Sequence, residues 1–158
     1  MITLTQAIIY LSYNIFIVIM FGWSLNSISE SWYRLEGWKK ILFTLFCFSL
    51  GGLMIFQENG TAVFPFFFLS GSGLCFTGAA MAFKDKPDSI VHSIGAYTCI
   101  FSGFLGLFFQ EQEYIPFLLF LLLALLASRM KNKTYWIEQA AFITLMLGLV
   151  LKHQIWQK

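Results

Sequence analysis

Charge is scarce in this chain of 158 residues. Only 11% of the residues are Asp, Glu, Lys or Arg, whereas 58% are hydrophobic. A soluble domain carries about twice this charged fraction, so the composition excludes an ordinary soluble globular protein. The net charge is only +2 and the basic residues form no stripe, so we expect no nucleic-acid partner. The composition instead predicts membrane lipids as the main partner.

Cysteine and histidine are also rare, with three and two copies respectively. No Cys-x-x-Cys pair or Cys/His cluster has the spacing of a zinc site, and we expect neither a metal nor a cofactor. Cys47, Cys75 and Cys99 are interpreted as small packing residues within predicted spans. Nucleotide-binding glycine motifs and the Gly-x-Ser-x-Gly nucleophile elbow are absent too, so the corresponding enzyme classes have no support in the sequence.

Long hydrophobic runs, in contrast, are abundant. Six segments approach the roughly 20 apolar residues that a helix needs to cross a bilayer. The first is preceded by no Lys or Arg, so we expect no cleaved secretory signal. The sequence predicts an all-α integral membrane protein, in which residues 1–158 form a single bundle of six transmembrane helices with short loops. The predicted spans are residues 3–25, 40–56, 62–83, 89–109, 115–128 and 136–156.

The loops between these spans alternate in charge. Eight of the ten Lys and Arg residues lie in or beside the first, third and fifth loops, and the second and fourth loops contain none. Because positive residues are retained on the cytoplasmic side, the first, third and fifth loops are predicted to face the cytoplasm. Both termini are then expected on the non-cytoplasmic side. The expected localisation is the inner (cell) membrane of a bacterium.

Small residues recur at helical spacing in two of the predicted spans. Gly71 and Gly78 occur in the third span, and Gly103 and Gly106 in the fourth. Small residues let two helix backbones approach closely, and such packing joins helices in lipid. We therefore predict a tight hairpin of these two spans, with Gly78 and Gly103 on the contact. The alternative is a break in the third span at residues 71–73, lining a cavity.

The first predicted span carries a polar stripe. Gln6, Tyr10 and Asn14 are spaced four residues apart and so share one face of a helix. Asn14 is expected near the middle of the bilayer, where polar side chains face the protein interior. Two interpretations stay open for this stripe, namely hydrogen bonds to neighbouring helices or a water-filled vestibule reached from outside.

Four ionisable residues are expected in the cytoplasmic half of the bundle. Asp88 and His92 lie four residues apart at the start of the fourth span, and Glu138 lies about one turn inside the sixth. Ionisable side chains within spans are costly and are therefore functional candidates. Structural roles are the alternative, with Asp88 as a helix cap and Glu138 beside a helix N-terminus. Glu30, in the first loop at the inner end of the first span, is predicted as a fourth member, although it can instead pair with Arg34.

These polar groups predict a protein that moves or senses an ion or a small solute along a polar path in the bundle. Asn14 approaches the path from outside, and the four ionisable residues approach it from inside. One alternative is an intramembrane hydrolase or transferase that acts on a lipid through Asp88, His92 and Glu138. Another is a structural or accessory subunit, whose packing stripes serve a homo-oligomer or a partner membrane subunit.

Overall fold

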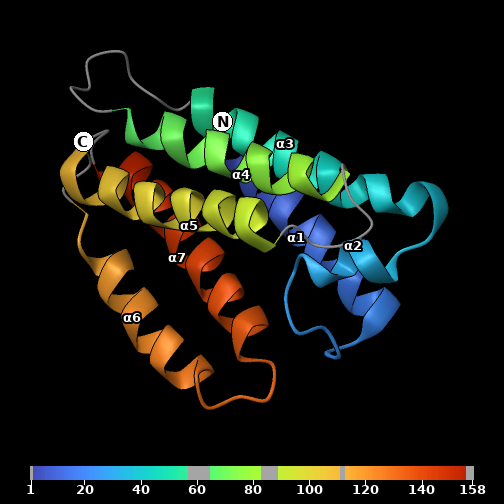
Figure 1. Ribbon diagram of the computed structural model, residues 1–158. Helices are drawn as coiled ribbons and strands as arrows, with labels where there is room; N and C mark the ends of the chain where they lie inside the picture. Colours follow the sequence, from blue (N-terminus) through green and yellow to red (C-terminus); the bar gives the residue numbers. More distant parts are fainter. Residues whose placement is uncertain (1, 57–64, 83–88, 111–112, 156–158) are drawn as a thin grey trace.

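The structure is a computed structural model that describes residues 2–56, 65–82, 89–110 and 113–155. Within these ranges every regular element is a helix, and no strand occurs (Figure 1). Hydrophobic runs without internal proline explain this, since α-helices satisfy all their backbone hydrogen bonds internally. The elements are α1 (Ile2–Phe21), α2 (Glu30–Arg34), the 3₁₀ helix η1 (Gly37–Lys40), α3 (Ile41–Phe56), α4 (Phe66–Ala82), α5 (Ser89–Leu105), the π-helical turn η2 (Gly106–Gln110), α6 (Ile115–Ala127) and α7 (Lys133–Ile155).

Four of the described helices are long and apolar enough to cross a membrane. They are α1, α3 extended by η1, α5 extended by η2, and α7. The apolar helices α4 and α6 are shorter, with 17 and 13 residues. At a rise of 1.5 Å per residue, α6 is about 20 Å long, less than the ~30 Å hydrocarbon core of a bilayer. The described part of the chain is thus an all-helical protein with four candidate membrane-spanning helices.

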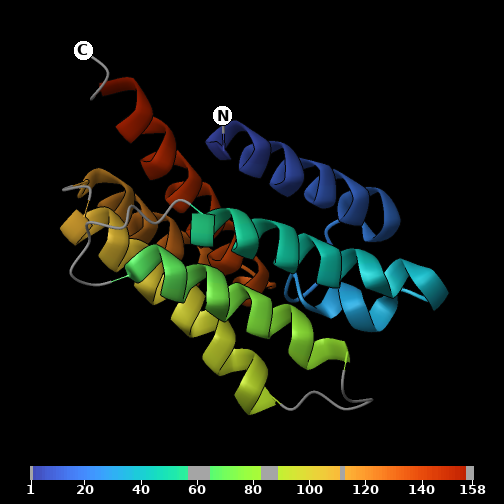
Figure 2. The ribbon, with the colours of Figure 1, turned by 90° about the horizontal axis from the view of Figure 1, so that it is seen from above.

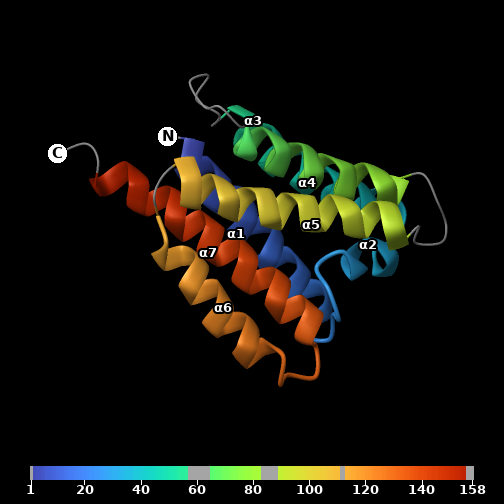
Figure 3. The ribbon, with the colours of Figure 1, turned by 60° about the vertical axis from the view of Figure 1, so that its left-hand side comes forward.

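The helices form two groups, which meet at α1 and also where α5 packs against α7. In the first group, α4 lies between α3 and α5 and packs extensively against both (Figure 2). In the second group, α6 and α7 pack as a hairpin, and α1 contacts both α3 and α7 (Figure 3). Apolar side chains face outward from these helices. On α1, for example, Leu4, Ile15 and Ile19 are each more than half exposed. An outer surface of this kind suits lipid and not water.

Glycine backbones bring α4 close to its two neighbours. A Cβ atom at Gly51 of α3 would lie 2.6 Å from the carbonyl oxygen of Gly71, and one at Gly73 would lie 2.7 Å from that of Gly95 in α5. Gly71 therefore packs against α3, and Gly73 packs against α5. Because α4 is continuous from Phe66 to Ala82, the alternative of a helix break at residues 71–73 is wrong.

The expected glycine contact between α4 and α5 needs a correction. Gly78 faces Cys47 of α3 and not α5. Gly103 lies between the Ser70 hydroxyl of α4 and the Leu145 side chain of α7. Gly106 is buried and begins the π-helical turn η2. Gly78 is therefore not on the α4–α5 contact, whereas Gly103 does meet α4 at Ser70. The closest backbone approach of the two helices is at Gly73 and Gly95.

Candidate functional site

A small cavity of about 40 Å³ lies toward the end of the bundle where α3, α5 and α7 begin, between these helices, α4 and the segment after α1. Two ionisable side chains line it, Glu138 from α7 and His92 from α5. Two thiols and two hydroxyl-bearing residues share the wall with them. These are Cys47 of α3, Cys99 of α5, Thr77 of α4 and Ser29 of the segment between α1 and α2.

Glu138 and His92 reach the cavity from similar depths. His92 is the fourth residue of α5, and Glu138 is the sixth residue of α7. A rise of 1.5 Å per residue puts them roughly 5 and 8 Å from the first residues of their helices. The structure thus brings two of the predicted site residues to one cavity from helices that are far apart in the sequence.

Among the described residues, Glu138 makes one hydrogen bond. Its Oε2 accepts a hydrogen bond of 2.6 Å from the backbone N–H of Ile28. Among the described residues the one ion pair joins Arg34 to Glu30, so no basic side chain neutralises Glu138 there. A carboxylate at this depth is costly unless it is hydrogen-bonded, paired or neutralised by a proton or a cation.

His92 adds a second incompletely satisfied group to the cavity. Its Nδ1 atom is buried and has no hydrogen-bond partner among the described residues. A site of about 40 Å³ is large enough for two or three water molecules at roughly 10–15 Å³ each. Such waters can connect an imidazole to a carboxylate that it does not touch directly. The arrangement can therefore hold or pass a proton between two helices.

Asn14 lies outside this cavity. Its amide nitrogen donates 2.8 Å to the carbonyl oxygen of Tyr10, and its side-chain oxygen accepts from Gln139 of α7. The Tyr10 hydroxyl in turn donates to the Gln139 side-chain oxygen. Of the two interpretations of the polar stripe, hydrogen bonding between helices is the one that describes Asn14 and Tyr10. Tyr10, Asn14 and Gln139 also line a separate groove between α1 and α7.

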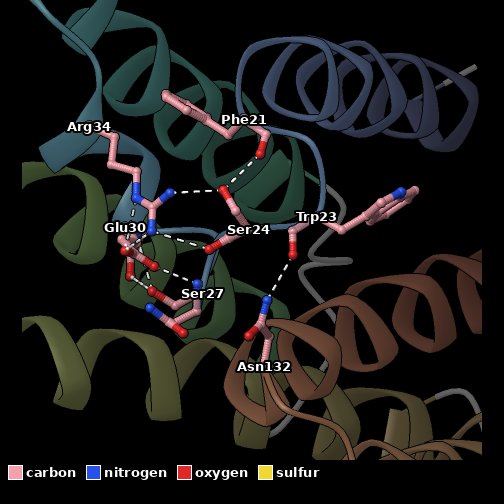
Figure 4. A network of polar contacts seen from close by, with 9 residues as sticks. Phe21, Trp23, Ser24, Ser27, Glu30, Arg34 and Asn132 are labelled. Carbon is pink, nitrogen blue, oxygen red and sulfur yellow. Dashed lines mark hydrogen bonds and ion pairs between the residues drawn. The ribbon is translucent and has the colours of Figure 1, made fainter.

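Glu30 is also engaged elsewhere. It forms an ion pair of 2.8 Å with Arg34 and accepts a hydrogen bond from the backbone N–H of Asn26 (Figure 4). Burial acts to raise the pKa of Glu30, but the bonds from Asn26 and Arg34 outweigh it and hold that pKa below its ordinary value. Glu30 does not line the cavity. Asp88, the remaining predicted member of the site, lies outside the described residues.

The segment between α1 and α3 covers one end of the cavity. Asn132, just before α7, donates 2.8 Å from its amide to the carbonyl oxygen of Trp23 (Figure 4). The backbone N–H of Tyr135 donates 2.8 Å to the carbonyl oxygen of Asn26. These bonds join the first loop to the start of α7, which places the Ile28 N–H against Glu138.

Several cavity residues were not predicted from the sequence. Thr77, Cys47 and Cys99 occur in apolar helices with small residues around them, which gives no indication that they share a wall. Ser29 belongs to a Ser-x-Ser-x-Ser run, the only sequence feature that could have marked it. The Ile28 N–H is a backbone group, and no sequence pattern identifies it.

Other cavities and contacts offer less chemistry. The groove between α5 and α6, of about 510 Å³, is lined by apolar and aromatic side chains without a carboxylate, imidazole or thiol. Within the part of the chain that the structure describes, no three His, Cys, Asp or Glu side chains gather closely enough to hold a metal ion. Comparison with protein families, curated proteins and solved structures finds no match for this chain.

Proposed function

We propose that this protein moves or senses an ion or a small solute through the helix bundle, and that a proton or small cation is handled at Glu138 and His92. The observation that carries the proposal is the shared cavity. A carboxylate and an imidazole from two helices line it, and the carboxylate has no ion-pair partner among the described residues. Both groups bind and release protons within the physiological range when their surroundings are suitably tuned.

The depth of these groups supports the same proposal. An ionisable side chain inside a membrane helix is expensive, so its presence there favours a functional role over a packing role. Packing at this position could be provided by an apolar side chain without that cost. The unpartnered Nδ1 of His92 and the space for water supply what a proton relay needs beside Glu138.

We further propose six membrane crossings, with both termini outside and the cavity near the cytoplasmic face. The first and fifth loops, which carry six of the Lys and Arg residues in or beside them, meet at one end of the bundle (Figure 4). The positive-inside rule assigns that end to the cytoplasm of a bacterial cell. The two shorter helices, α4 and α6, are the crossings that depend most on their packed neighbours.

Reconstitution in liposomes tests the proposed function. Purified protein in liposomes with a trapped pH-sensitive dye should dissipate an imposed proton gradient, and parallel vesicles with a sodium or potassium gradient test for cations. Glu138→Gln and His92→Ala should reduce the flux to that of empty liposomes. Glu36→Gln, an exposed carboxylate in the same loop region, is the matched control and should retain it. Equal flux in all variants would reject the cavity as the path.

One observation favours an enzyme as the second candidate. Ser29, His92 and Glu138 line the same cavity and are the side-chain types of a nucleophile, a base and an orienting acid. The hydrogen-bond chain of such a triad is not formed, because Ser29 pairs with Ser27 and Glu138 accepts from Ile28. A fluorophosphonate probe distinguishes the two functions. Covalent labelling that disappears in Ser29→Ala supports a lipid hydrolase, and its absence supports transport.

A further inference from the structure

Residues 22–37, between α1 and α3, cover one end of the cavity that Glu138 and His92 line. Leu25, Ile28 and Leu35 are each 3% exposed or less, and Ser31 is fully buried. Ile28 and Ser29 line the cavity directly. None of the charged side chains of the segment lines the cavity. Glu30 and Arg34 pair with each other (Figure 4), and Glu36 is exposed.

The segment is braced internally, so it can move as one body. The Arg34 guanidinium donates 2.9 Å to the Ser24 hydroxyl and 3.1 Å to the Ser24 carbonyl oxygen (Figure 4). The same guanidinium donates to Glu30, whose carboxylate also accepts from the backbone of Asn26. These contacts fix the two limbs of the loop to each other independently of the helices beneath.

A glycine with left-handed backbone stands at each end of the segment. Gly22 has a φ of +59° and Gly37 a φ of +55°. Nothing lies within 4 Å of the position that a Cβ would occupy at either residue. Glycine tolerates large changes in backbone angle at low cost, and hinges consist of a few such positions at the ends of elements. The two glycines can therefore act as hinges for residues 22–37.

The segment is held to the bundle by the packing of two of its buried apolar side chains in the hydrophobic core. A few hydrogen bonds hold it as well, and one of them ends on a charged group. Tyr13 of α1 bonds to Ser31 at 2.6 Å, and the start of α7 bonds to Trp23 and Asn26. The remaining bond, from the Ile28 N–H to Glu138, ends on a carboxylate. A hydrogen bond to an ionised acceptor is roughly twice as strong as a neutral one, so a proton or cation on Glu138 weakens it.

We propose that residues 22–37 form a lid over the cavity, which ionised Glu138 holds closed and which opens when Glu138 takes up its proton or cation. The lid regulates the site of the proposed function and rests on that function for the identity of its trigger. The other titratable groups that line the cavity or lie beside Glu138 are His92 and Cys99 from α5, Cys47 from α3 and Tyr135 from α7. Thr77 is the side chain that α4 contributes to this wall, and it does not titrate.

The native cysteines allow a direct test. Cys47 and Cys99 line the cavity and are each 1% exposed, so their reaction with a water-soluble methanethiosulfonate reports how often the cavity opens. Cys75→Ser removes the remaining thiol from the background. In that background, Glu138→Gln replaces the ionised carboxylate by a neutral group of the same shape. At constant pH it should accelerate labelling by about tenfold or more, the effect of weakening one charge-assisted hydrogen bond.

Two further variants control for folding and position. Tyr13→Phe removes a lid contact but leaves Glu138 in place, and should also accelerate labelling. Thr144→Val removes a buried hydrogen bond within α7 away from the cavity, and should label at the parent rate. If Glu138→Gln does not fold, as judged by circular dichroism, Tyr13→Phe alone decides the question. Labelling at the parent rate in each folded lid variant, with complete labelling after denaturation, would overturn the lid.

The lid and the proposed function can fail separately. Faster labelling in Glu138→Gln without proton or cation flux in liposomes supports the lid and rejects transport. Flux that depends on Glu138, with labelling unchanged in the variants, supports transport and rejects the lid.

Discussion

The carboxylate of Glu138 in α7 accepts a hydrogen bond of 2.6 Å from the backbone N–H of Ile28, 110 residues earlier in the chain. This bond joins the last helix to the loop that follows the first helix. It also connects Glu138, which lines the cavity, to the segment that covers one end of that cavity. The Glu138 carboxylate therefore contributes to the stability of this region and, in the proposed lid, also controls the access of solvent to the cavity.

Replacing the Glu138 carboxylate should separate its role as a hydrogen-bond acceptor from the effect of its charge. Glu138→Ala leaves the Ile28 N–H without its acceptor in a buried position, which costs about 1–3 kcal/mol of unfolding free energy. Glu138→Gln should cost less, because the amide oxygen can still accept the bond. Thermal melting in the same detergent measures both variants. An equal fall in melting temperature for Glu138→Ala and Glu138→Gln would mean that the charge, and not the hydrogen bond, stabilises this region.

Two adjacent glycines in α3 should respond oppositely to the same substitution. A Cβ at Gly51 would lie 2.6 Å from the Gly71 carbonyl oxygen, whereas nothing lies within 4 Å of a Cβ at Gly52. Gly51→Ala should therefore lower the unfolding free energy by about 1–3 kcal/mol through overpacking. Gly52→Ala should be neutral or raise it by up to about 1 kcal/mol, because alanine favours a helix. Similar melting temperatures for both would exclude the close α3–α4 contact.

Acid should weaken the first loop through Glu30. The pKa of Glu30 is held below its ordinary value by the Asn26 and Arg34 bonds despite the opposing effect of burial. Its contribution to stability is thus complete above the ordinary pKa and is lost as pH falls through the lower folded-state pKa. Because Glu30 and Arg34 are partly exposed, the effect is small and screened by salt. Melting temperatures of the native protein and Glu30→Gln should converge as the pH is lowered, and a constant difference would contradict this linkage.

The proposed topology has a labelling test. In a background without native cysteines, a cysteine at position 59 should react with an impermeant thiol reagent from outside intact cells. A cysteine in place of Lys131 should react only after the membrane is opened. The expectation rests on the uneven distribution of Lys and Arg among the loops. Labelling of position 131 from outside would reverse the orientation.

Hydrophobic runs predict the helices well, because each buried or lipid-facing helix needs an apolar sequence of sufficient length. They predict the rotation of a helix poorly. Successive residues are about 100° apart, so Gly71 and Gly73 point to nearly opposite sides of α4, whereas Gly71 and Gly78 share one side. Gly71 and Gly78 accordingly both meet α3, and Gly73 meets α5. The sequence indicates that α4 is closely packed but not which neighbour meets which glycine.

For the candidate site, the sequence likewise indicates the depth of a side chain along its helix but not the partner that it meets. The depths of His92 and Glu138 follow from their positions near the starts of two helices, and both residues line the cavity. Asn14 and Glu30 were expected on the same path, but nearer hydrogen-bond partners engage them. Which polar group finds a local partner depends on loop geometry. Here the partner of Glu138 is a backbone group, the Ile28 N–H, of a kind that every residue type except proline carries.

The position of α4 between two helices has a consequence for how the chain can vary. Its backbone is in close contact along two opposite sides, at Gly71 with α3 and at Gly73 with α5. Between these sides, Leu69 and Phe76 are 42% and 63% exposed. These two residues lie on one side of the helix, whereas the opposite side is buried, as at Ser70. Sequence change in α4 is therefore confined mainly to one exposed strip, where one apolar side chain can replace another without moving a neighbour. The apolar residues of this strip can vary freely, but a larger residue at Gly71 or Gly73 would push α4 away from a neighbour and disrupt the three-helix layer.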